Sequence, residues 1–202
     1  MRWLALHLLA IQNRRIGKVI EMEHEALVKK WLMSDPARME ALAIAAAQKL
    51  PGWCLAAGFV RNLVWDKLHN FSTNTALNDI DLIYFDPDDT SGSRDHDIEQ
   101  GLRKVSTFPW SVKNQARMHE RNSDCPYTST EDAMSFWVEV ETAIGAAFDD
   151  EGDVILVAPF GVQPLFDYTI TLNPKRPKRT DFEARICAKR WLQTWPRLVV
   201  NA

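Results

Sequence analysis

The segment 35–69 constrains the fold of this chain most, because signals for a helix, a strand and a turn follow one another within it. Asp35 followed by Pro36 predicts the start of a helix, since Asp caps free backbone amides and Pro is preorganised for the first helical position. Apolar residues then recur at helical spacing, which predicts a helix over 36–50. A Pro-Gly pair beginning at Pro51 ends it.

A strand, a sharp turn and a second helix are expected next. Residues 53–56 form a short apolar run typical of a buried strand, Gly58 permits the turn, and apolar spacing predicts a helix over 59–69. Backbone N–H groups at the start of such a helix attract an anion, so Gly58 is predicted to contact phosphate. Arg61 lies in the first turn, where the helix dipole disfavours a cation by about 0.3–1 kcal/mol unless an anion is present. The alternative is that Arg61 only covers surface with its aliphatic stem.

Two carboxylates mark the next strand. Residues 79–85 alternate in polarity as a strand does, and Asp79 and Asp81 are two positions apart. Their side chains therefore leave one face, with about 6–7 Å between the Cα atoms. Such carboxylates repel each other unless a cation lies between them, and Mg²⁺ or Mn²⁺ prefers these oxygen ligands. The alternative is a polar strand end that faces water.

The remainder of the chain mixes helices and strands, without an internal repeat. A capping box, Thr180 with Glu183, predicts the start of the last helix, and Pro196 ends it. A Gly-containing turn over 149–153 predicts a β-hairpin. The other expected elements are a helix over 96–105, a strand over 110–118, a helix over 132–137, and hairpin strands over 138–144 and 154–158.

The predicted strand 110–118 carries a second group of polar residues. Alternation places Lys113, Arg117 and His119 on one face, where they could bind phosphate or an anionic acceptor, and Asn114 on the other. A half-exposed antiparallel strand without any function has the same pattern. For His119, a structural role is the simpler interpretation.

Composition limits the classes of partner. The net charge of −3 gives no global positive field that would gather nucleic acid. A local basic stretch, 175–179, is interrupted by prolines and is interpreted as a solvated loop. The three cysteines are widely spaced, without a zinc or disulfide pattern, which favours a reducing cytoplasm.

The length of 202 residues favours a single domain, 1–202, with small additions. The opening apolar run, 3–11, is too short to span a bilayer and has no cleavage site after it, so we expect neither an anchor nor a signal peptide. Helical periodicity becomes regular only at Met22. Residues 1–21 are therefore expected to contribute little to the fold.

Four motifs together resemble a known family. GFVRNLVWD begins at Gly58, DIDLIYF at Asp79, WSVKNQARMH at Trp110 and APFG at Ala158. They are similar to a bacterial family of nucleotidyltransferase-like proteins of uncharacterised activity, within the superfamily that includes DNA polymerase beta and the tRNA CCA-adding enzymes. The resemblance covers about residues 36–200, which leaves residues 1–35 as an N-terminal helical extension.

The resemblance implies an α+β fold, with a mixed, mostly antiparallel sheet, flanking helices, and added helices at both termini. It implies that Asp79 and Asp81 hold Mg²⁺ or Mn²⁺ and that a nucleoside monophosphate passes from a nucleoside triphosphate to an acceptor hydroxyl. The acceptor, whether small molecule, RNA or protein, is left open. The candidate nucleotide-binding residues are Gly58, Arg61 and Asn62, together with Lys113 and Asn114, to which the resemblance assigns no role.

Catalytic members of this superfamily usually carry a third carboxylate on a neighbouring strand. The expected strand 110–118 has Lys113 and Asn114 at its centre and no acid. Glu139, two residues before Glu141 on the following strand, is therefore the candidate, and the alternative is a rim of glutamates that faces solvent. If Glu139 does not reach the metals, the chain would bind a nucleotide without transferring it, as a sensing or partner-binding module. Asp-x-Asp also occurs in phosphatases, but Gly58 upstream of it counts against that class.

Overall fold

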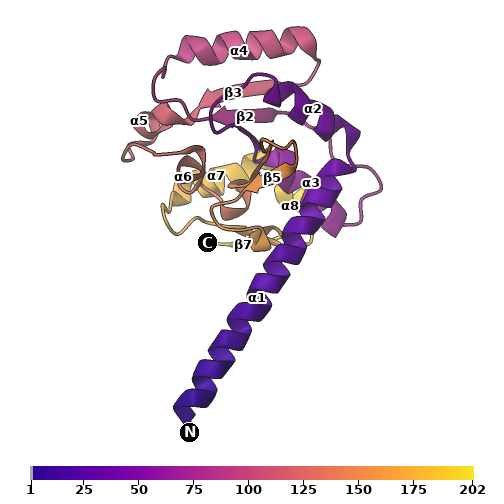
Figure 1. Cartoon of the computed structure of the whole chain (residues 1–202), viewed down its shortest axis with the longest axis vertical. Coiled ribbons are helices and arrows are strands. Elements are labelled where there is room, and N and C mark those ends of the chain that lie inside the picture. The colour runs from indigo at the N-terminus through magenta and orange to yellow at the C-terminus, as the bar shows by residue number, and fades with distance from the viewer. Residues whose placement is uncertain (1) are drawn as a thin grey trace.

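A five-stranded sheet organises the chain in the computed structural model, which describes residues 2–202, with side chains from residue 15 onward. Its strand order is β3-β2-β1-β4-β5, and every neighbouring pair is antiparallel except β2 with β3. The expected α+β class with a mostly antiparallel sheet and flanking helices is confirmed (Figure 1). The strands are β1 (Cys54–Ala56), β2 (Ile80–Tyr84), β3 (Trp110–Asn114), β4 (Gly145–Phe148) and β5 (Val154–Val157).

Helices cover one face of this sheet. Side chains from alternate strand positions, such as Leu55, Leu82 and Val112, point to that face and are completely buried in a core to which α1, α2, α3 and α4 contribute. This burial supplies most of the driving force for the fold, because apolar area removed from water contributes about 25 cal/mol per Å². The helices are α1 (Arg2–Met33), α2 (Pro36–Ala46), α3 (Gly58–Leu68), α4 (Gly92–Val105), α5 (Met118–Asn122), α6 (Thr130–Met134), α7 (Arg179–Lys189) and α8 (Trp191–Thr194).

Helix α2 begins where the sequence predicts. The Asp35 carboxylate accepts a hydrogen bond from the backbone N–H of Arg38 at 3.1 Å, and Pro follows it at the first helical position. The helix ends at Ala46, before the expected residue 50, because Lys49 adopts a left-handed conformation with φ of 52°. That turn leads the chain directly into β1.

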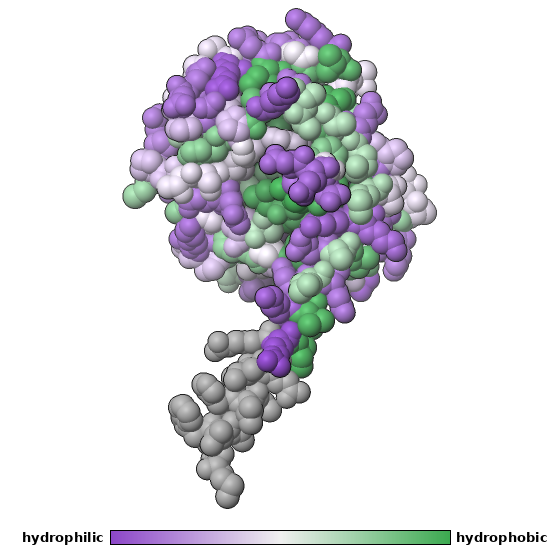
Figure 2. Space-filling view, in the orientation of Figure 1, coloured by the Kyte–Doolittle hydropathy of each residue, from purple (hydrophilic) through white to green (hydrophobic). Residues whose placement is uncertain are grey.

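The long helix α1 joins the body only along its C-terminal part. Val28 and Leu32 are buried in the core, whereas the N-terminal part projects away (Figure 1). Figure 2 shows apolar side chains on α1 where it leaves the body, and Ile16 and Val19 are 51% and 54% exposed. The Glu21 carboxylate accepts a hydrogen bond from the backbone N–H of Val162 at 2.5 Å. Residues 1–21 therefore do contribute to the fold at Glu21, contrary to expectation, and the side chains of 1–14 lie outside the described residues.

The opposite face of the sheet is only partly covered. Cys54, Ala56 and Ile83 pack there against Met134 of α6, and the rest of the face is left to the cleft described below. A separate aromatic cluster fixes α7 and α8 beside α3. Its buried members are Trp65, Ile170, Phe182, Trp191, Trp195 and Leu198. A two-stranded parallel sheet that the sequence did not indicate, β6 (Thr169–Thr171) with β7 (Val199–Asn201), supports this cluster.

The hairpin forms further along the chain than predicted. Its turn is as expected, with the Asp149 carboxylate accepting from the backbone N–H of Asp153 at 2.8 Å, but its first strand is β4. The segment 138–144 is instead irregular, with a short 3₁₀ helix, Val140–Thr142. Glu139 and Glu141 are both buried there but bind different partners, Arg185 and Thr169, whereas alternation along a strand would have placed them on one face.

Two other predicted boundaries were wrong. Strand β3 ends at Asn114, because the Asn114 side-chain oxygen accepts from the backbone N–H of Ala116 at 3.0 Å and starts a 3₁₀ turn, Gln115–Arg117. The last helix does not use Thr180 as its cap. It begins at Arg179 and is divided by Arg190, whose φ of 54° redirects the chain into α8.

Candidate active site

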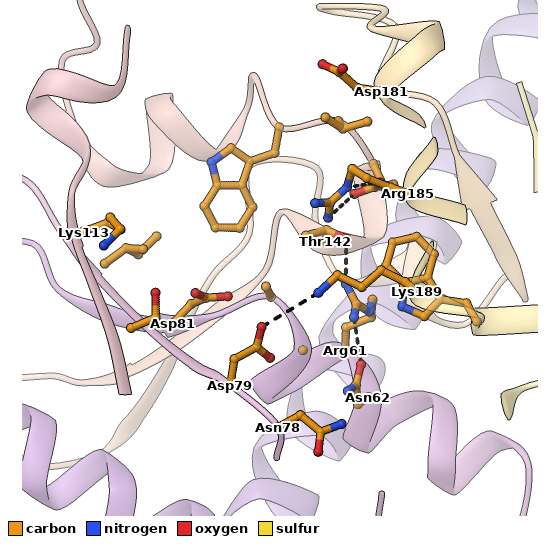
Figure 3. Close-up of a pocket in the computed structure, with 18 of the residues that line it drawn as sticks. Arg61, Asn62, Asn78, Asp79, Asp81, Lys113, Thr142, Asp181, Arg185 and Lys189 are labelled. Atoms are coloured by element: carbon orange, nitrogen blue, oxygen red, sulfur yellow. Dashed lines mark hydrogen bonds and ion pairs between the residues drawn. The ribbon is translucent and has the colours of Figure 1, made fainter. Parts of the chain in front are cut away.

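A cleft of about 1310 Å³ opens on the face of the sheet that carries Asp81 (Figure 3). The start of α3, the loop before β2, and strands β2 and β3 form its floor and one side. Helices α5, α7 and α8 and the segment 136–142 form the other walls. The cleft therefore unites segments that are widely separated in the sequence.

Both predicted metal-binding carboxylates line this cleft. Asp79 comes directly before β2 and its side chain is 56% exposed, whereas Asp81 lies within β2, opposite Ala56 on β1 and Ser111 on β3. Burial raises the pKa of Asp81, the neighbouring charge of Asp79 raises it further, and a hydrogen bond with Ser111 opposes the rise. The two carboxylates thus repel each other, and a cation between them would relieve the repulsion.

The turn that precedes α3 is strained. Ala57 has φ of 56° and ψ of −121°, a conformation that a residue with a Cβ rarely adopts, and it lies directly before Gly58 at the cleft. A Cβ on Gly58 would lie 3.2 Å from the Asn62 amide nitrogen, so a side chain there would push Asn62 away. The N–H groups of Val60 and Arg61 donate to the Ala57 carbonyl at 3.2 and 3.0 Å. The sequence had suggested that amides at the start of this helix are free to bind an anion. These two are not free, because both are hydrogen-bonded to Ala57.

Arg61 is buried at the inner end of the cleft and is only 5% exposed. It donates to the Thr142 hydroxyl at 2.7 Å and to the Asn62 carbonyl oxygen at 2.9 Å (Figure 3). Its guanidinium stacks on two rings, Trp65 and Trp191, at 5.0 and 4.8 Å from the centroids. Its Nε is buried and has no hydrogen-bond partner among the described residues. The interpretation of Arg61 as a surface cover is therefore wrong.

The charge of Arg61 is held close to the acids of the site. Burial lowers the pKa of Arg61 to about 10, and Glu139, Asp79 and Glu141 oppose that change. The guanidinium consequently remains protonated at neutral pH. A buried cation with an unused donor favours an anionic ligand, because such a ligand would restore the solvation that the group has lost.

Glu139 lines the cleft but is not a free carboxylate. It is 1% exposed, and its two oxygens accept from Arg185 at 2.6 and 3.1 Å. Glu141, the other acid of this segment, is directed away from the cleft and accepts from the Thr169 hydroxyl and the Thr171 backbone N–H at 2.9 and 2.8 Å. In the part of the chain that the structure describes, no group of three or more His, Cys, Asp or Glu residues is arranged to hold a metal.

Helix α7 presents a charged row to the cleft that the sequence analysis missed. Asp181, Arg185 and Lys189 are four residues apart and all line the cleft. The Lys189 ammonium lies 3.9 Å from the Asp79 carboxylate (Figure 3). The i, i+4, i+8 spacing of these residues in the sequence indicates that they share one polar face of the helix.

Of the polar residues of the predicted strand 110–118, some line the cleft and others have partners elsewhere. Lys113 is exposed and lines the cleft from β3, but Asn114 does not line it. The Asn114 amide nitrogen donates to the carbonyls of Asp86 and Asp89 at 2.7 and 2.9 Å, so the residue fixes the loop after β2. Arg117 forms an ion pair with the buried Asp95. The strand ends before Arg117 and His119, and the predicted common face with Lys113 does not exist.

The basic stretch 175–179 is not merely a solvated loop. Arg176 forms an ion pair with Asp124, and the Lys178 ammonium donates to the Asn122 side-chain oxygen at 3.1 Å. Both cations line the cleft, as does Arg121 of α5. These contacts join the segment before α7 to the end of α5 and complete one rim of the cleft.

A match to a known family shows the class of this protein. Residues 43–200 match a family described as Nucleotidyltransferase, and the chain belongs to it. No curated protein matches the chain. None of the helices described is both long and apolar enough to cross a membrane.

Solved structures agree with this assignment. An NMR structure reported to reveal a CCA-adding enzyme head domain is 31% identical, with a TM-score of 0.77, and the match covers 87% of this chain and 95% of that one. A CCA-adding enzyme in complex with CTP is 13% identical, with a TM-score of 0.55, and the match covers 87% of this chain and 43% of that one. A tRNA-processing enzyme complex has a TM-score of 0.51 at 15% identity, over 80% of this chain and 42% of that one. The last two likenesses concern the fold alone.

Proposed function

We propose that this chain transfers a nucleoside monophosphate from a nucleoside triphosphate to an acceptor hydroxyl in a reaction that requires Mg²⁺ or Mn²⁺. The observation that carries the proposal is the presence, in one cleft, of paired carboxylates and a cationic wall. Asp79 and Asp81 lie opposite Arg61, Arg185 and Lys189. Carboxylates suit a divalent cation and the basic wall suits a triphosphate, so the cleft offers complementary charge to both parts of a metal–nucleotide complex.

Asp79 and Asp81 are the residues that would hold the metal. Two observations support the fit of these carboxylates to a metal ion. The pKa of Asp81 is raised, and the Lys189 ammonium already places a positive charge beside Asp79. The bound metal would neutralise phosphate charge and polarise the α-phosphate. The likeness of this fold to that of a CCA-adding enzyme in complex with CTP supports a nucleotide ligand, and the choice among nucleotides is left to experiment.

The protein groups would act chiefly by position and charge. Arg61, fixed by Thr142 and Asn62, would meet the triphosphate without reorganising, which is the condition for strong electrostatic stabilisation. The Lys189 ammonium would leave the Asp79 carboxylate and bind phosphate oxygens instead. The acceptor hydroxyl then forms its bond to the α-phosphorus, the bond to the β-phosphate oxygen breaks, and pyrophosphate leaves while the hydroxyl proton passes to water.

The second candidate is a module on the same fold that binds a nucleotide without transferring it. The state of Glu139 favours it, because both of its oxygens are engaged by Arg185 and it offers no free base. The two candidates share every residue of the binding site. They differ only in turnover.

One experiment separates these candidates. Binding of ATP, CTP, GTP and UTP would be measured by calorimetry with Mg²⁺ and with EDTA, and pyrophosphate release would be followed on the same samples with a panel of hydroxyl acceptors. We expect metal-dependent binding and release, both lost in the Asp79→Ala/Asp81→Ala variant. Binding without release for every acceptor would favour the module. Absence of binding by the wild type would disprove the assignment of this cleft.

A further inference from the structure

The cleft has cations on both sides of its carboxylates, and only one side is needed for a triphosphate. Its volume of about 1310 Å³ exceeds the roughly 300–1,000 Å³ of a pocket for one drug-sized ligand. In Figure 3, Lys113 lies on the opposite side of Asp81 from Arg61, Arg185 and Lys189. The cleft therefore has room for a second ligand on the Lys113 side of the carboxylates.

Three further cations line the cleft and are called here the outer cations: Lys113 of β3, Arg121 of α5 and Lys178 before α7. Among the described residues none of them forms an ion pair, whereas Arg185 and Lys189 do. The Lys113 ammonium donates to the Val112 carbonyl at 2.9 Å, and Lys178 donates to Asn122. Both ammonium groups keep further donors unused.

The register of the sheet fixes how near these cations are to the chemistry. Ser111 lies opposite Asp81 in the parallel pair of β2 and β3, and Lys113 is two residues further on the same face. Asn122, which follows Arg121, binds the Lys178 ammonium at 3.1 Å and so brings the last two cations together. Lys113 thus lies near Asp81 on the sheet, and Arg121 and Lys178 lie close to each other in the lining of the same cleft.

We propose that the outer cations bind a phosphate group on a small acceptor molecule, whose hydroxyl would then face Asp81. This inference rests on the proposed function. A small phosphorylated molecule fits better than RNA, because these cations line a cleft and the whole chain carries −3. Placing the phosphate of the acceptor on this side separates it from the triphosphate, which would otherwise repel it.

The test uses inorganic phosphate as the probe. Phosphate would be titrated into the full chain saturated with Mg²⁺ and a non-hydrolysable α,β-methylene nucleoside triphosphate, and its binding would be followed by ³¹P NMR. Acetate, as a carboxylate, and a short single-stranded RNA would be tested in parallel experiments. We expect phosphate to bind with the nucleotide still in place. We expect Lys113→Met/Arg121→Met/Lys178→Met to weaken phosphate binding at least about 10-fold, which corresponds to about 1.4 kcal/mol, and to change nucleotide affinity less than about 3-fold.

A matched variant controls for charge alone. Lys30→Met/Lys104→Met/Arg179→Met removes three exposed cations outside the cleft and should leave phosphate binding unchanged. Displacement of phosphate by the nucleotide would assign the outer cations to the triphosphate and overturn the inference. So would unchanged phosphate binding in the cleft variant, tighter binding of acetate, or binding of RNA alone. If the wild type binds no nucleotide, the proposed function itself fails, and the acceptor role fails with it even where phosphate still binds.

Discussion

The two walls of the cleft differ in how firmly their cations are held. On the inner wall, Arg61 and Arg185 are fixed by Thr142, Asn62 and Glu139. On the outer wall, the outer cations are partly or largely exposed and have few partners. A wall that is preorganised suits the charge that changes during the reaction, and a loosely held wall suits a ligand that must enter and leave.

The largest effect on activity is expected from changing the carboxylates, which lie between the two walls. Asp81→Asn should reduce the rate of pyrophosphate release at least about 100-fold, the scale of losing one preorganised electrostatic group in an active site. The measurement is a steady-state assay with saturating Mg²⁺, and circular dichroism should show an unchanged fold. Retention of more than about a tenth of the rate would remove Asp81 from the catalytic centre.

Removal of a cation from the inner wall should destabilise the protein more than removal of a cation from the outer wall. Arg61→Met leaves the Thr142 hydroxyl and the Asn62 carbonyl without their buried donor, and should lower the free energy of unfolding by about 1–3 kcal/mol. Lys113→Met is the matched change on the outer wall and should stay within about 0.5 kcal/mol. Urea denaturation of both variants measures the difference. Equal losses would contradict the contrast between a preorganised and a loosely held wall.

A pH series tests the repulsion between the carboxylates. The pKa of Asp81 in the folded protein is raised above the ordinary 3.8, so the folded state binds this proton more tightly than the unfolded state does. Stability from this group is therefore present below about pH 3.8 and is lost as pH rises through the higher folded value. Without metal, Asp81→Asn should raise the free energy of unfolding by about 0.5–2 kcal/mol at pH 7, and by little near pH 4. A gain that is equal at both pH values would exclude this cause.

The smallest effect concerns the cation that lies between the inner wall and Asp79. Lys189→Met should tighten Mn²⁺ binding to the nucleotide-free protein about 5-fold, since a charge pair near 4 Å in water is worth about 1 kcal/mol. Titration followed by electron paramagnetic resonance would measure it. Arg179→Met, on the same helix but outside the cleft, should leave Mn²⁺ affinity unchanged. Weaker Mn²⁺ binding in Lys189→Met would show that the ammonium does not compete with the metal.

Local signals in the sequence were sufficient for the elements that carry the chemistry. The Asp35 cap, the turn at Gly58 and the strand with Asp81 were predicted from their immediate neighbours, and the structure has all three. The Arg61 position was predicted as well, from the helix dipole. These features depend on residues within one or two turns of the chain, where spacing is informative.

Partners distant in sequence could not be predicted. Nothing near Glu139 indicates that Arg185 binds it, and the expected strand does not form because contacts with distant residues outweigh local propensity. Likewise, nothing near Thr142 in the sequence indicates that its hydroxyl accepts a hydrogen bond from Arg61. Asn114 was misassigned because its role as a cap of a turn depends on where the strand ends. The cytoplasmic location and the metal stay predictions.

The distance in sequence between Arg61 and Thr142, 81 residues, has a consequence for folding. Asp66 and Trp195, which join α3 to the C-terminal region, are 129 residues apart. Contacts of such separation form only after long loops have closed, so the inner wall should be completed late in folding. Recovery of nucleotide affinity after dilution from urea should therefore lag behind recovery of helical signal, and affinity would measure the fraction of molecules that have reached the native state.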